Sequence, residues 1–256
     1  MLRTRIIPII QISNRALVKT VNYKNPKYLG DPLNAIKIFN EKRVDELLII
    51  DINAAKRKSK IDFDYIEELC SECFMPIGYG GGIETLEDIK RLFTLGVEKI
   101  IVNSLIYTNP TLIENAIKLY GAQSIVASID FKKHWLTKKI VPYIKSATQK
   151  INVELHAYIK QCLQLGVGEI IFNNIEREGT FKGYDLDLIK EYIQGLTIPT
   201  VINGGANNFQ NLKDAKKAGA DALAAGSFFS LQQPHLAVLI TYLSNEEIIE
   251  INSQDK

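Results

Sequence analysis

Short apolar runs recur along the chain, and each is followed by a longer stretch that fits a helix. The runs are rich in β-branched residues, which is typical of buried strands. They lie at Ile6–Ile10, Glu46–Ile50, Pro76–Tyr79, Lys99–Val102, Ser124–Ile129, Glu169–Phe172, Thr200–Ile202 and Ala222–Ala225. Eight alternating strand and helix units predict an α/β fold, a (βα)8 TIM barrel, with a doubly wound sheet as the alternative.

The two halves of the chain repeat each other. The segment PIGYGGGIETLEDIKR, which starts at Pro76, matches PTVINGGANNFQNLKD, which starts at Pro199, 123 residues further on. Two upstream segments, from Val44 and Val167, have the same offset of 123 residues. We therefore predict one domain over residues 1–256, built from two half-barrels of four βα units each.

Between the strands, the chain predicts helices and one long loop. The stretches TLEDIKRLFTLG and NFQNLKDAKKAG each end in glycine, at Gly96 and Gly219, which indicates helix ends. Residues 133–150 are basic and lack a clear period, so we expect an irregular loop after the fifth strand. The polar tail from Asn245 is expected to fray.

Composition narrows the classes of function. Apolar residues make up 46% and charged residues 23% of the 256, which is ordinary for a globular protein. A formal net charge of +2 argues against a protein that binds nucleic acid or a membrane surface. We find neither an apolar stretch of membrane-spanning length nor the cleavage site of a signal peptide, and we expect a cytoplasmic protein.

The three cysteines are Cys70, Cys73 and Cys162. The first two form a C-x-x-C in FDYIEELCSECF, which has the pattern of an amphipathic helix. A redox or metal site would need a thioredoxin-type context or a second pair of ligands. We interpret these residues as packing or surface thiols in a reducing compartment, and we predict neither a metal nor a cofactor.

Glycines and small polar residues follow four of the predicted strands, the third, fourth, seventh and eighth. Glycine lets the backbone approach a ligand closely, and the N–H groups that open a following helix attract anions. Barrels frequently bind phosphate after strands seven and eight, and the repeat predicts a second site after strands three and four. The residues are Gly81, Gly82, Asn103 and Ser104 in one site and Gly204, Gly205, Gly226 and Ser227 in the other. The alternative is that these glycines only form tight βα turns.

The first strand runs into Gln11, at the end where barrels place their chemistry. An amide donates and accepts hydrogen bonds but does not exchange a proton near neutral pH. Gln11 is therefore either a polar plug or a catalytic position without its acid.

Several segments of the chain resemble the HisF family, the cyclase subunit of imidazole glycerol phosphate synthase. They are DELLIIDINA, GYGGGIETLEDIKR, GVEKIIVNS, SIVASIDFKK, GVGEIIFNNIEREGTFKGYD and GGANNFQNLKDAKKAGADALAAGS. The resemblance runs from Arg3 to about Ser230, almost without gaps. The sister isomerase of histidine synthesis shares the half-barrel repeat, but EREGTFKGYD is similar to HisF.

The resemblance implies a partner and a mechanism. A glutaminase, HisH, would dock on the N-terminal face of the barrel, and its ammonia would cross to the C-terminal face. There it would attack a small molecule with two terminal phosphates, which splits and closes an imidazole ring, with two aspartates as general acid and base. Asp130 matches one aspartate, whereas Gln11 stands at the other. General acid–base catalysis is typically worth roughly 10²–10⁴ in rate, and an amide cannot supply it.

Further positions on the C-terminal face follow or depart from the family. The resemblance places Lys19, Asp51 and Glu178 at the substrate, and Glu178 stands where the family usually has Asp. Ser13–Ala16 replace a Lys-Asp-Gly-Arg run, and the loop after the fifth strand lacks the family's glycines. The ring-closing face is therefore altered at several places.

The N-terminal face keeps the family's pattern. Arg5, Glu46, Lys99 and Glu169 match the four charges around the family's ammonia entrance, and Glu98 matches an acidic position that couples to the partner. Glu46 and Glu169 are also 123 residues apart, as the repeat requires. The alternative is that the four charges only cap the core as ion pairs.

Smaller candidates lie in the loops. His134, near Asp130, is a candidate proton donor, although a solvated histidine explains it as well. The cluster KRKSK, Lys56–Lys60, either steers an anionic substrate or is a solvated loop. Trp135 is interpreted as a loop anchor or a lid residue.

Two hypotheses for function remain. In the first, the protein is a HisF-like subunit that binds a HisH-type glutaminase and conducts ammonia to another acceptor. The resemblance suggests a sugar-modifying amidotransferase of surface polysaccharide synthesis, because HisF-like proteins occur beside such enzymes. In the second, the protein is the working cyclase of histidine synthesis, with Asp130 carrying the chemistry.

Overall fold

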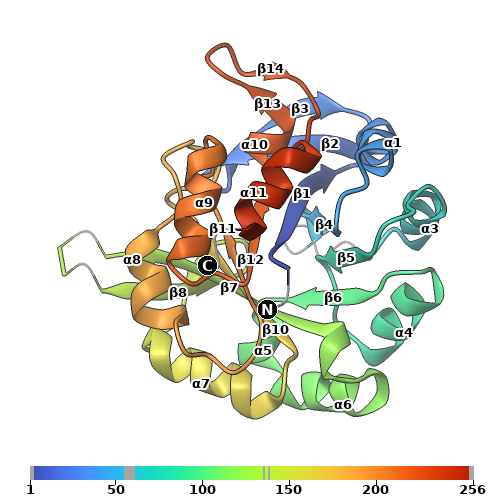
Figure 1. Ribbon diagram of the computed structural model, residues 1–256. Coiled ribbons are helices and arrows are strands. Elements are labelled where there is room, and N and C mark those ends of the chain that lie inside the picture. Colours follow the sequence, from blue (N-terminus) through green and yellow to red (C-terminus); the bar gives the residue numbers. More distant parts are fainter. Residues whose placement is uncertain (1–2, 55–60, 135, 138, 254–256) are drawn as a thin grey trace.

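The barrel is closed in the computed structural model, which describes residues 3–54, 61–134, 136–137 and 139–253. Within these residues the barrel strands are β1 (Arg5–Ser13), β4 (Leu47–Asp51), β5 (Ile77–Gly80), β6 (Lys99–Val102), β7 (Ile125–Lys133), β10 (Glu169–Asn174), β11 (Thr200–Asn203) and β12 (Ala222–Ala225). They pair in parallel, β12 with β1 at one junction and β7 with β10 at another, so no free edge is left (Figure 1). The closed ring confirms the predicted (βα)8 barrel and rules out the doubly wound sheet.

Helices surround the barrel (Figure 1). They are α1 (Pro32–Lys42), α3 (Phe63–Ser71), α4 (Leu86–Thr94), α5 (Ser104–Thr108), α6 (Pro110–Tyr120), α7 (Leu155–Leu165), α8 (Leu186–Leu188), α9 (Phe209–Lys217), α10 (Ser227–Ser230) and α11 (Asn245–Ser253), with short turns η1 (Ala122–Ser124) and η2 (Ile189–Ile193). Thr85 and Asp88 form a capping box that starts α4. Gly96 and Gly219 follow α4 and α9 with φ of 101° and 109°, which confirms the predicted helix ends.

Side chains alternate between two apolar layers along each barrel strand. In β1, Ile6, Ile10 and Ile12 pack under the helices, whereas Ile7 and Ile9 belong to the barrel interior. The interior layer consists of Ile7, Leu48, Ile101, Val126, Ile171, Val201, Ala222 and Ala224. The same alternation directs the residues at both ends of each strand, and it therefore decides which polar side chains face the barrel axis.

Two hairpins extend the barrel strands at their C-terminal ends. β1 continues into β2 (Ala16–Val21) and β3 (Lys24–Gly30), which the sequence reasoning did not predict. Residues 133–150 are not the irregular loop that we expected, because β7 pairs with β8 (Ile140–Ile144) and β8 with β9 (Gln149–Lys150). β7 runs beyond the barrel to Lys133, and antiparallel pairing satisfies the backbone groups there.

The C-terminal segment is also more ordered than its polar composition suggests. After a small hairpin of β13 (Leu231–Gln232) and β14 (Ala237–Val238), helix α11 buries Ile248 and Ile251. Asn252 accepts a hydrogen bond from the backbone N–H of Thr4 at 2.7 Å. The expected fraying from Asn245 is therefore wrong up to Ser253, because two buried isoleucines hold the helix. No helix among the described residues has the length and apolar character needed to cross a bilayer.

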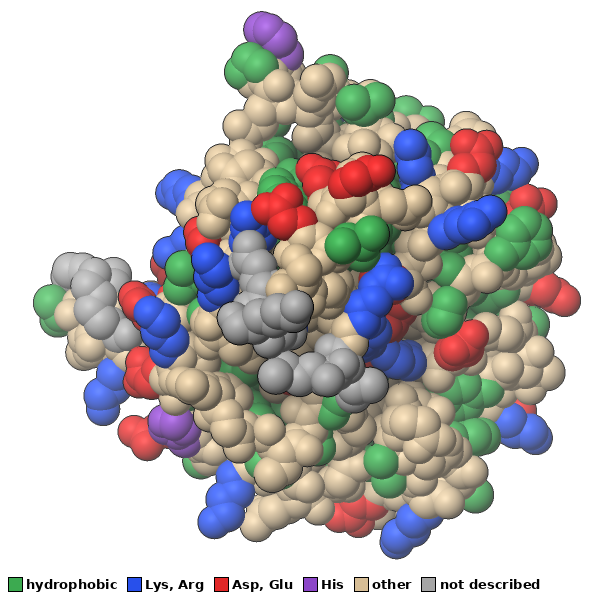
Figure 2. Space-filling model, viewed as in Figure 1, with side chains coloured by type: hydrophobic (Ala, Val, Ile, Leu, Met, Phe, Trp, Pro, Cys, Tyr) green, Lys and Arg blue, Asp and Glu red, His purple; other side chains and the backbone are tan. Residues whose placement is uncertain are grey.

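Figure 2 shows one face of the molecule, in the view in which both chain ends lie near the middle of Figure 1. Acidic and basic side chains are interspersed over it, without a large area of one sign. This distribution agrees with the formal net charge of +2.

Candidate functional site

Inward-facing positions bring the candidate residues together at the two ends of the barrel. In β1 the alternation that points Ile7 and Ile9 inward also applies to Arg5 at the start of the strand and Gln11 near its end. One strand thus supplies a charge to the N-terminal end and an amide to the C-terminal end. The candidate site therefore has two parts, a cavity and a ring of charges.

The cavity lies at the C-terminal ends of the strands and has a volume of about 400 Å³. All the residues predicted for catalysis, phosphate binding or substrate contact line it, except the candidate proton donor His134. These residues are Gln11, Lys19, Asp51, Gly81, Gly82, Asn103, Ser104, Asp130, Glu178, Gly204, Gly205, Gly226 and Ser227. The volume lies within the ordinary range for a small-molecule site.

Gln11 is held by hydrogen bonds on both ends of its amide. Its Oε1 accepts from the backbone N–H of Thr20 at 2.9 Å and lies 3.0 Å from the Thr20 hydroxyl. Its Nε2 donates to Oε1 of Glu178 at 3.3 Å. The side chain therefore takes part in a network but offers no titratable group at this position.

Asp130 is buried and accepts several hydrogen bonds through Oδ1. The donors are Asn173 Nδ2 at 2.9 Å, the Tyr23 hydroxyl at 3.2 Å and the Ser128 hydroxyl at 3.4 Å. Burial raises the pKa of Asp130 to about 6, although these hydrogen bonds favour the charged form. Burial and Asp130 both raise the pKa of Tyr23, so Tyr23 stays a neutral donor. A carboxyl that titrates near neutrality is suited to proton transfer.

Lys19 and Glu178 form a buried ion pair between β2 and the loop after β10. The Lys19 ammonium also donates to the carbonyl of Thr20 at 2.9 Å, and Oε2 of Glu178 accepts from the backbone N–H of Tyr23 at 3.1 Å. Burial lowers the pKa of Lys19, while the adjacent carboxylate favours its charged form. The pair links the hairpin of β2 and β3 to the barrel.

Asp51 is the last residue of β4, and its carboxylate accepts hydrogen bonds from the turn that follows. Its Oδ1 accepts from the backbone N–H groups of Asn53 at 2.9 Å and Ala54 at 3.1 Å. Gly81 packs against this turn, since a Cβ on Gly81 would lie 2.5 Å from the Asp51 carbonyl oxygen. Asp51 therefore also shapes the neighbouring glycine loop.

The two predicted phosphate sites have the same backbone form. Gly81 and Gly82 have φ of 124° and 71°, and Gly204 and Gly205 have φ of 108° and 101°, all values that favour glycine. The turns therefore require glycine at these four positions, and both pairs also line the cavity.

The serines of the two sites differ. The hydroxyl of Ser104 accepts from the backbone N–H of Lys145 at 3.1 Å. The hydroxyl of Ser227 is buried and has no hydrogen-bond partner among the described residues. A buried hydroxyl without a partner is unfavourable unless a ligand satisfies it, so Ser227 fits an anion that binds in this cavity.

At the opposite end, Arg5, Glu46, Lys99 and Glu169 form a closed ring of ion pairs. Arg5 contacts both carboxylates, and Lys99 Nζ lies 2.9 Å from Glu46 and 2.8 Å from Glu169. Burial lowers the pKa of Arg5, but the two carboxylates outweigh this and raise it above its usual value. We call these four residues the charge ring; its charges balance, and an interior of apolar side chains lies above it.

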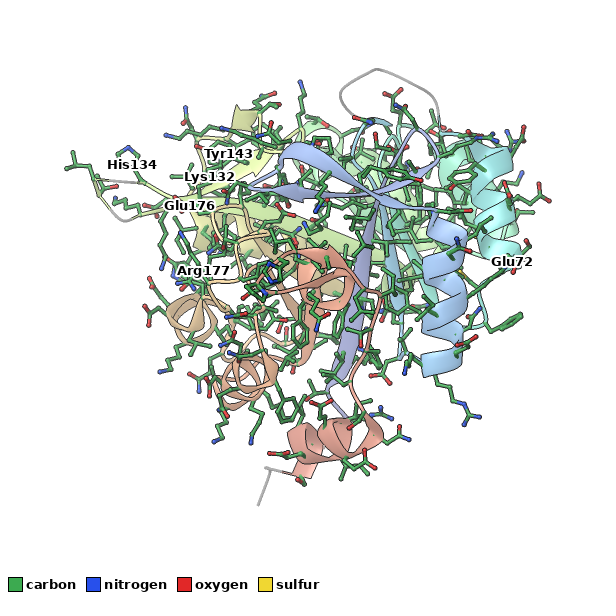
Figure 3. All side chains as sticks on the ribbon, turned by 90° about the horizontal axis from the view of Figure 1, so that it is seen from above. Glu72, Lys132, His134, Tyr143, Glu176 and Arg177 are labelled. Carbon is green, nitrogen blue, oxygen red and sulfur yellow. The ribbon has the colours of Figure 1, made fainter. Side chains whose placement is uncertain are left out.

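Glu98 and His134 do not line the cavity. Glu98 is exposed beside the charge ring. His134 is on the hairpin of β7 and β8, on the side of the barrel where Figure 3 labels Lys132, Tyr143 and Glu176, and Glu72 lies on the other side. Trp135 and Lys56–Lys60 lie outside the described residues.

The cysteines are free thiols, and no group of three or more metal-ligating side chains is found in the described part of the chain. Burial raises the pKa of Cys70 to about 11, and burial with neighbouring negative charge raises that of Cys73 to about 12. Neither thiol is therefore activated as a nucleophile.

Sequence reasoning missed Thr20, Tyr23, Asn173 and Asn203, all of which line the cavity. Asn203 donates to Asn173 at 2.8 Å, so the two asparagines continue the network around Asp130. Asn203 is the last residue of β11 and Asn173 is next to last in β10, and these positions at the C-terminal ends of barrel strands could have identified them. Tyr23 lies in the turn between β2 and β3, a hairpin that the sequence reasoning did not predict.

Comparison with known proteins identifies the family. A sequence model of the family described as "Histidine biosynthesis protein" matches residues 5–233. A provisionally named imidazole glycerol phosphate synthase subunit HisF of Leptospira interrogans is 42% identical over 248 residues, 96% of this chain and 98% of the relative. A provisionally named subunit hisF2 of Pseudomonas aeruginosa is 41% identical over 243 residues, 94% of this chain and 96% of the relative. The imidazole glycerol phosphate synthase subunit HisF of Petrotoga mobilis is 33% identical over 229 residues, 90% of this chain and 91% of the relative. With this breadth of similarity and a barrel that carries the expected residues at both ends, the chain belongs to the HisF family.

Proposed function

We propose that the protein is the synthase-side subunit of a glutamine amidotransferase complex. A HisH-type glutaminase binds the end of the barrel that carries the charge ring, and ammonia passes through the ring and the interior to the cavity. The support is that Arg5, Glu46, Lys99 and Glu169 match the family's entrance and lie in contact around the axis. Exposed Glu98, beside the ring, couples the two subunits.

Ring closure in the cavity is impaired because position 11 carries an amide. The proposal rests on the hydrogen bonds of Gln11. Its Oε1 accepts from Thr20 and its Nε2 donates to Glu178, so β1 presents an amide and not an acid to the cavity that Asp130 lines. Ammonia then serves another acceptor, and a sugar-modifying amidotransferase of surface polysaccharide synthesis is the one that the family resemblance suggests. A phosphorylated small molecule still binds between the two glycine sites.

The second candidate is a working cyclase of histidine biosynthesis. Asp130 favours it, because burial gives this carboxyl a pKa of about 6 and its donors hold it at the cavity. Lys19 and Glu178 also remain at the cavity as a polar pair.

Turnover of the bisphosphate substrate with ammonium chloride separates the two functions, because free ammonium bypasses the glutaminase. We expect a rate lower than that of an ordinary family cyclase by roughly 10²–10⁴, the usual worth of a general acid or base. A rate equal to that of the Petrotoga mobilis subunit, assayed in parallel, would support the second function and refute the first. In a separate assay, a HisH-type glutaminase should gain glutaminase activity on addition of this chain, and Glu98→Gln should weaken the gain.

A further inference from the structure

A buried network fastens the hairpin of β2 and β3 over the cavity. Glu178 is its centre, with Oε1 in contact with Lys19 Nζ, 3.0 Å from the Thr20 hydroxyl and 3.3 Å from Gln11 Nε2. The other oxygen, Oε2, accepts from the backbone N–H of Tyr23. Figure 3 shows this hairpin across one end of the barrel and α11 at the other. The carboxylate therefore joins β1, the end of β2 with the turn that follows it, and the loop after β10.

The partners of Gln11 fix which way its amide points. The backbone N–H of Thr20 can only donate, so it requires the oxygen of the amide at 2.9 Å. The carboxylate of Glu178 can only accept while it is ionised, so it requires the NH₂ group. With the amide turned by 180°, its NH₂ group would face the N–H of Thr20 and its oxygen would face the carboxylate of Glu178. Position 11 therefore suits a side chain with one acceptor and one donor.

One lysine contacts the central carboxylate of this network. Lys19 forms an ion pair with Glu178, and the two residues are 7% and 5% exposed. The other charged group linked to the network is Asp130, which Tyr23 connects to the same hairpin. A second carboxylate at position 11 would face Glu178 and share a single lysine with it.

We infer that Gln11 and Glu178 are a matched pair, in which Glu178 requires an amide at position 11 and excludes an ionised carboxylate there. The inference does not rest on the proposed ammonia transfer, because it depends only on these contacts. Glu178 is thus a positioning residue for the amide of Gln11. Restoring the acid alone places two carboxylates in contact, so one of them takes up a proton or the hairpin loosens.

A swap of the two groups tests the pair. Gln11→Glu keeps the shape of the side chain and replaces the donor with an acceptor. Glu178→Gln removes the central carboxylate, and the double variant restores one amide and one carboxylate in exchanged places. Hydrogen exchange of residues 16–30, followed by mass spectrometry, measures how firmly the hairpin is held.

We expect exchange in this segment to be faster in Gln11→Glu than in wild type by about tenfold or more, the effect of a pKa shift of about one unit. The double variant should exchange more slowly than Gln11→Glu and lose less protection than the two single variants add up to, because only one carboxylate remains. Recovery stops short of wild type, since an amide at position 178 has one acceptor oxygen where the carboxylate accepts on both. At about pH 8, above the usual pKa of glutamate, infrared difference spectra should show a protonated carboxyl in Gln11→Glu that the double variant lacks. A loss of packing alone would not produce that carboxyl band.

Equal exchange rates in Gln11→Glu and wild type, or an additive loss in the double variant, would overturn the inference. If Gln11→Glu does not fold, recovery of folded double variant supports the pair, and failure of both variants contradicts it. Gln11→Leu serves as a control, because it removes the donor without adding charge and should give no carboxyl band.

Discussion

Replacing Lys99 by methionine removes one of the two cations of the charge ring and keeps most of the aliphatic stem. The lysine contacts Glu46 at 2.9 Å and Glu169 at 2.8 Å, and these two carboxylate side chains are only 4% and 6% exposed. After the substitution both carboxylates depend on Arg5 alone, and the ring acquires a net negative charge.

The expected loss follows from these distances and exposures. At an effective dielectric constant of about 20, each contact is worth about 6 kcal/mol of Coulomb energy before desolvation is subtracted. Removing one partner of a buried ion pair typically costs about 3–5 kcal/mol. Because the Lys99 side chain is 21% exposed and Arg5 remains, we expect the lower end of that range. For a chain of this size, a loss of about 3 kcal/mol lowers the melting temperature by roughly 6–12 °C.

Equilibrium unfolding in urea measures the loss directly. Glu98→Gln is the matched control, because Glu98 is exposed beside the ring, and its change should stay within about 0.5 kcal/mol. Lys99→Arg should restore most of the stability, since it returns the cation. A loss in Lys99→Met no larger than that in Glu98→Gln would refute the reasoning, because the ring would then contribute no net stability.

Three further changes have expected results. Asp130→Asn should stabilise the protein at pH 7 by about 2–3 kcal/mol, because burial raises the pKa of Asp130 to about 6 and its ionised form therefore lowers the stability of the folded state at pH 7. In urea titrations this gain in stability should vanish as the pH falls from about 6 to about 4, the usual pKa of an aspartate. Ser227→Ala should raise the melting temperature in the absence of phosphate and reduce the rise that phosphate causes, since it removes a buried hydroxyl without a described partner. Ser104→Ala should lower the melting temperature, because the backbone N–H of Lys145 loses its hydrogen-bond acceptor. Gln11→Asp should increase ammonium-dependent turnover by less than the roughly 10²–10⁴ of a well-placed acid, and adding Glu178→Asp should increase it further; a full recovery by Gln11→Asp alone would contradict the contact between the two side chains.

The sequence predicted the barrel and the two glycine sites because both depend on periodic patterns, whereas Lys19, Asp51, Asp130 and Glu178 were placed at the cavity by the family resemblance. Alternation in β1 carries Arg5 and Gln11 to opposite ends of the barrel, and the 123-residue repeat locates the glycine pairs. The hairpins of β1 with β2 and of β2 with β3 were missed because the residue pairs that form their turns were not recognised as turns. Asn14–Arg15 and Asn22–Tyr23 all have positive φ, between 52° and 62°, which suits tight hairpin turns.

The partners of the candidate residues could not be predicted from the sequence. Tyr23 reaches Asp130 across 107 positions in the sequence, and Glu178 reaches Gln11 across 167. Contacts of this kind depend on how a hairpin folds over the barrel, and neither spacing nor residue type encodes that path. The same applies to Ser104 and Ser227, which are repeat mates but differ because the hairpin of β8 approaches only Ser104.

The length of the barrel keeps the charges at its two ends electrostatically almost independent. Arg5 and Gln11 are six residues apart on one strand, which separates them by about 20 Å. At an effective dielectric constant of about 20, two unit charges at that distance interact by only about 0.8 kcal/mol. An acid at the cavity end could therefore be lost during evolution with little effect on the charge state of the ring. A barrel of this length can change the chemistry of its cavity and keep the charge ring at its other end.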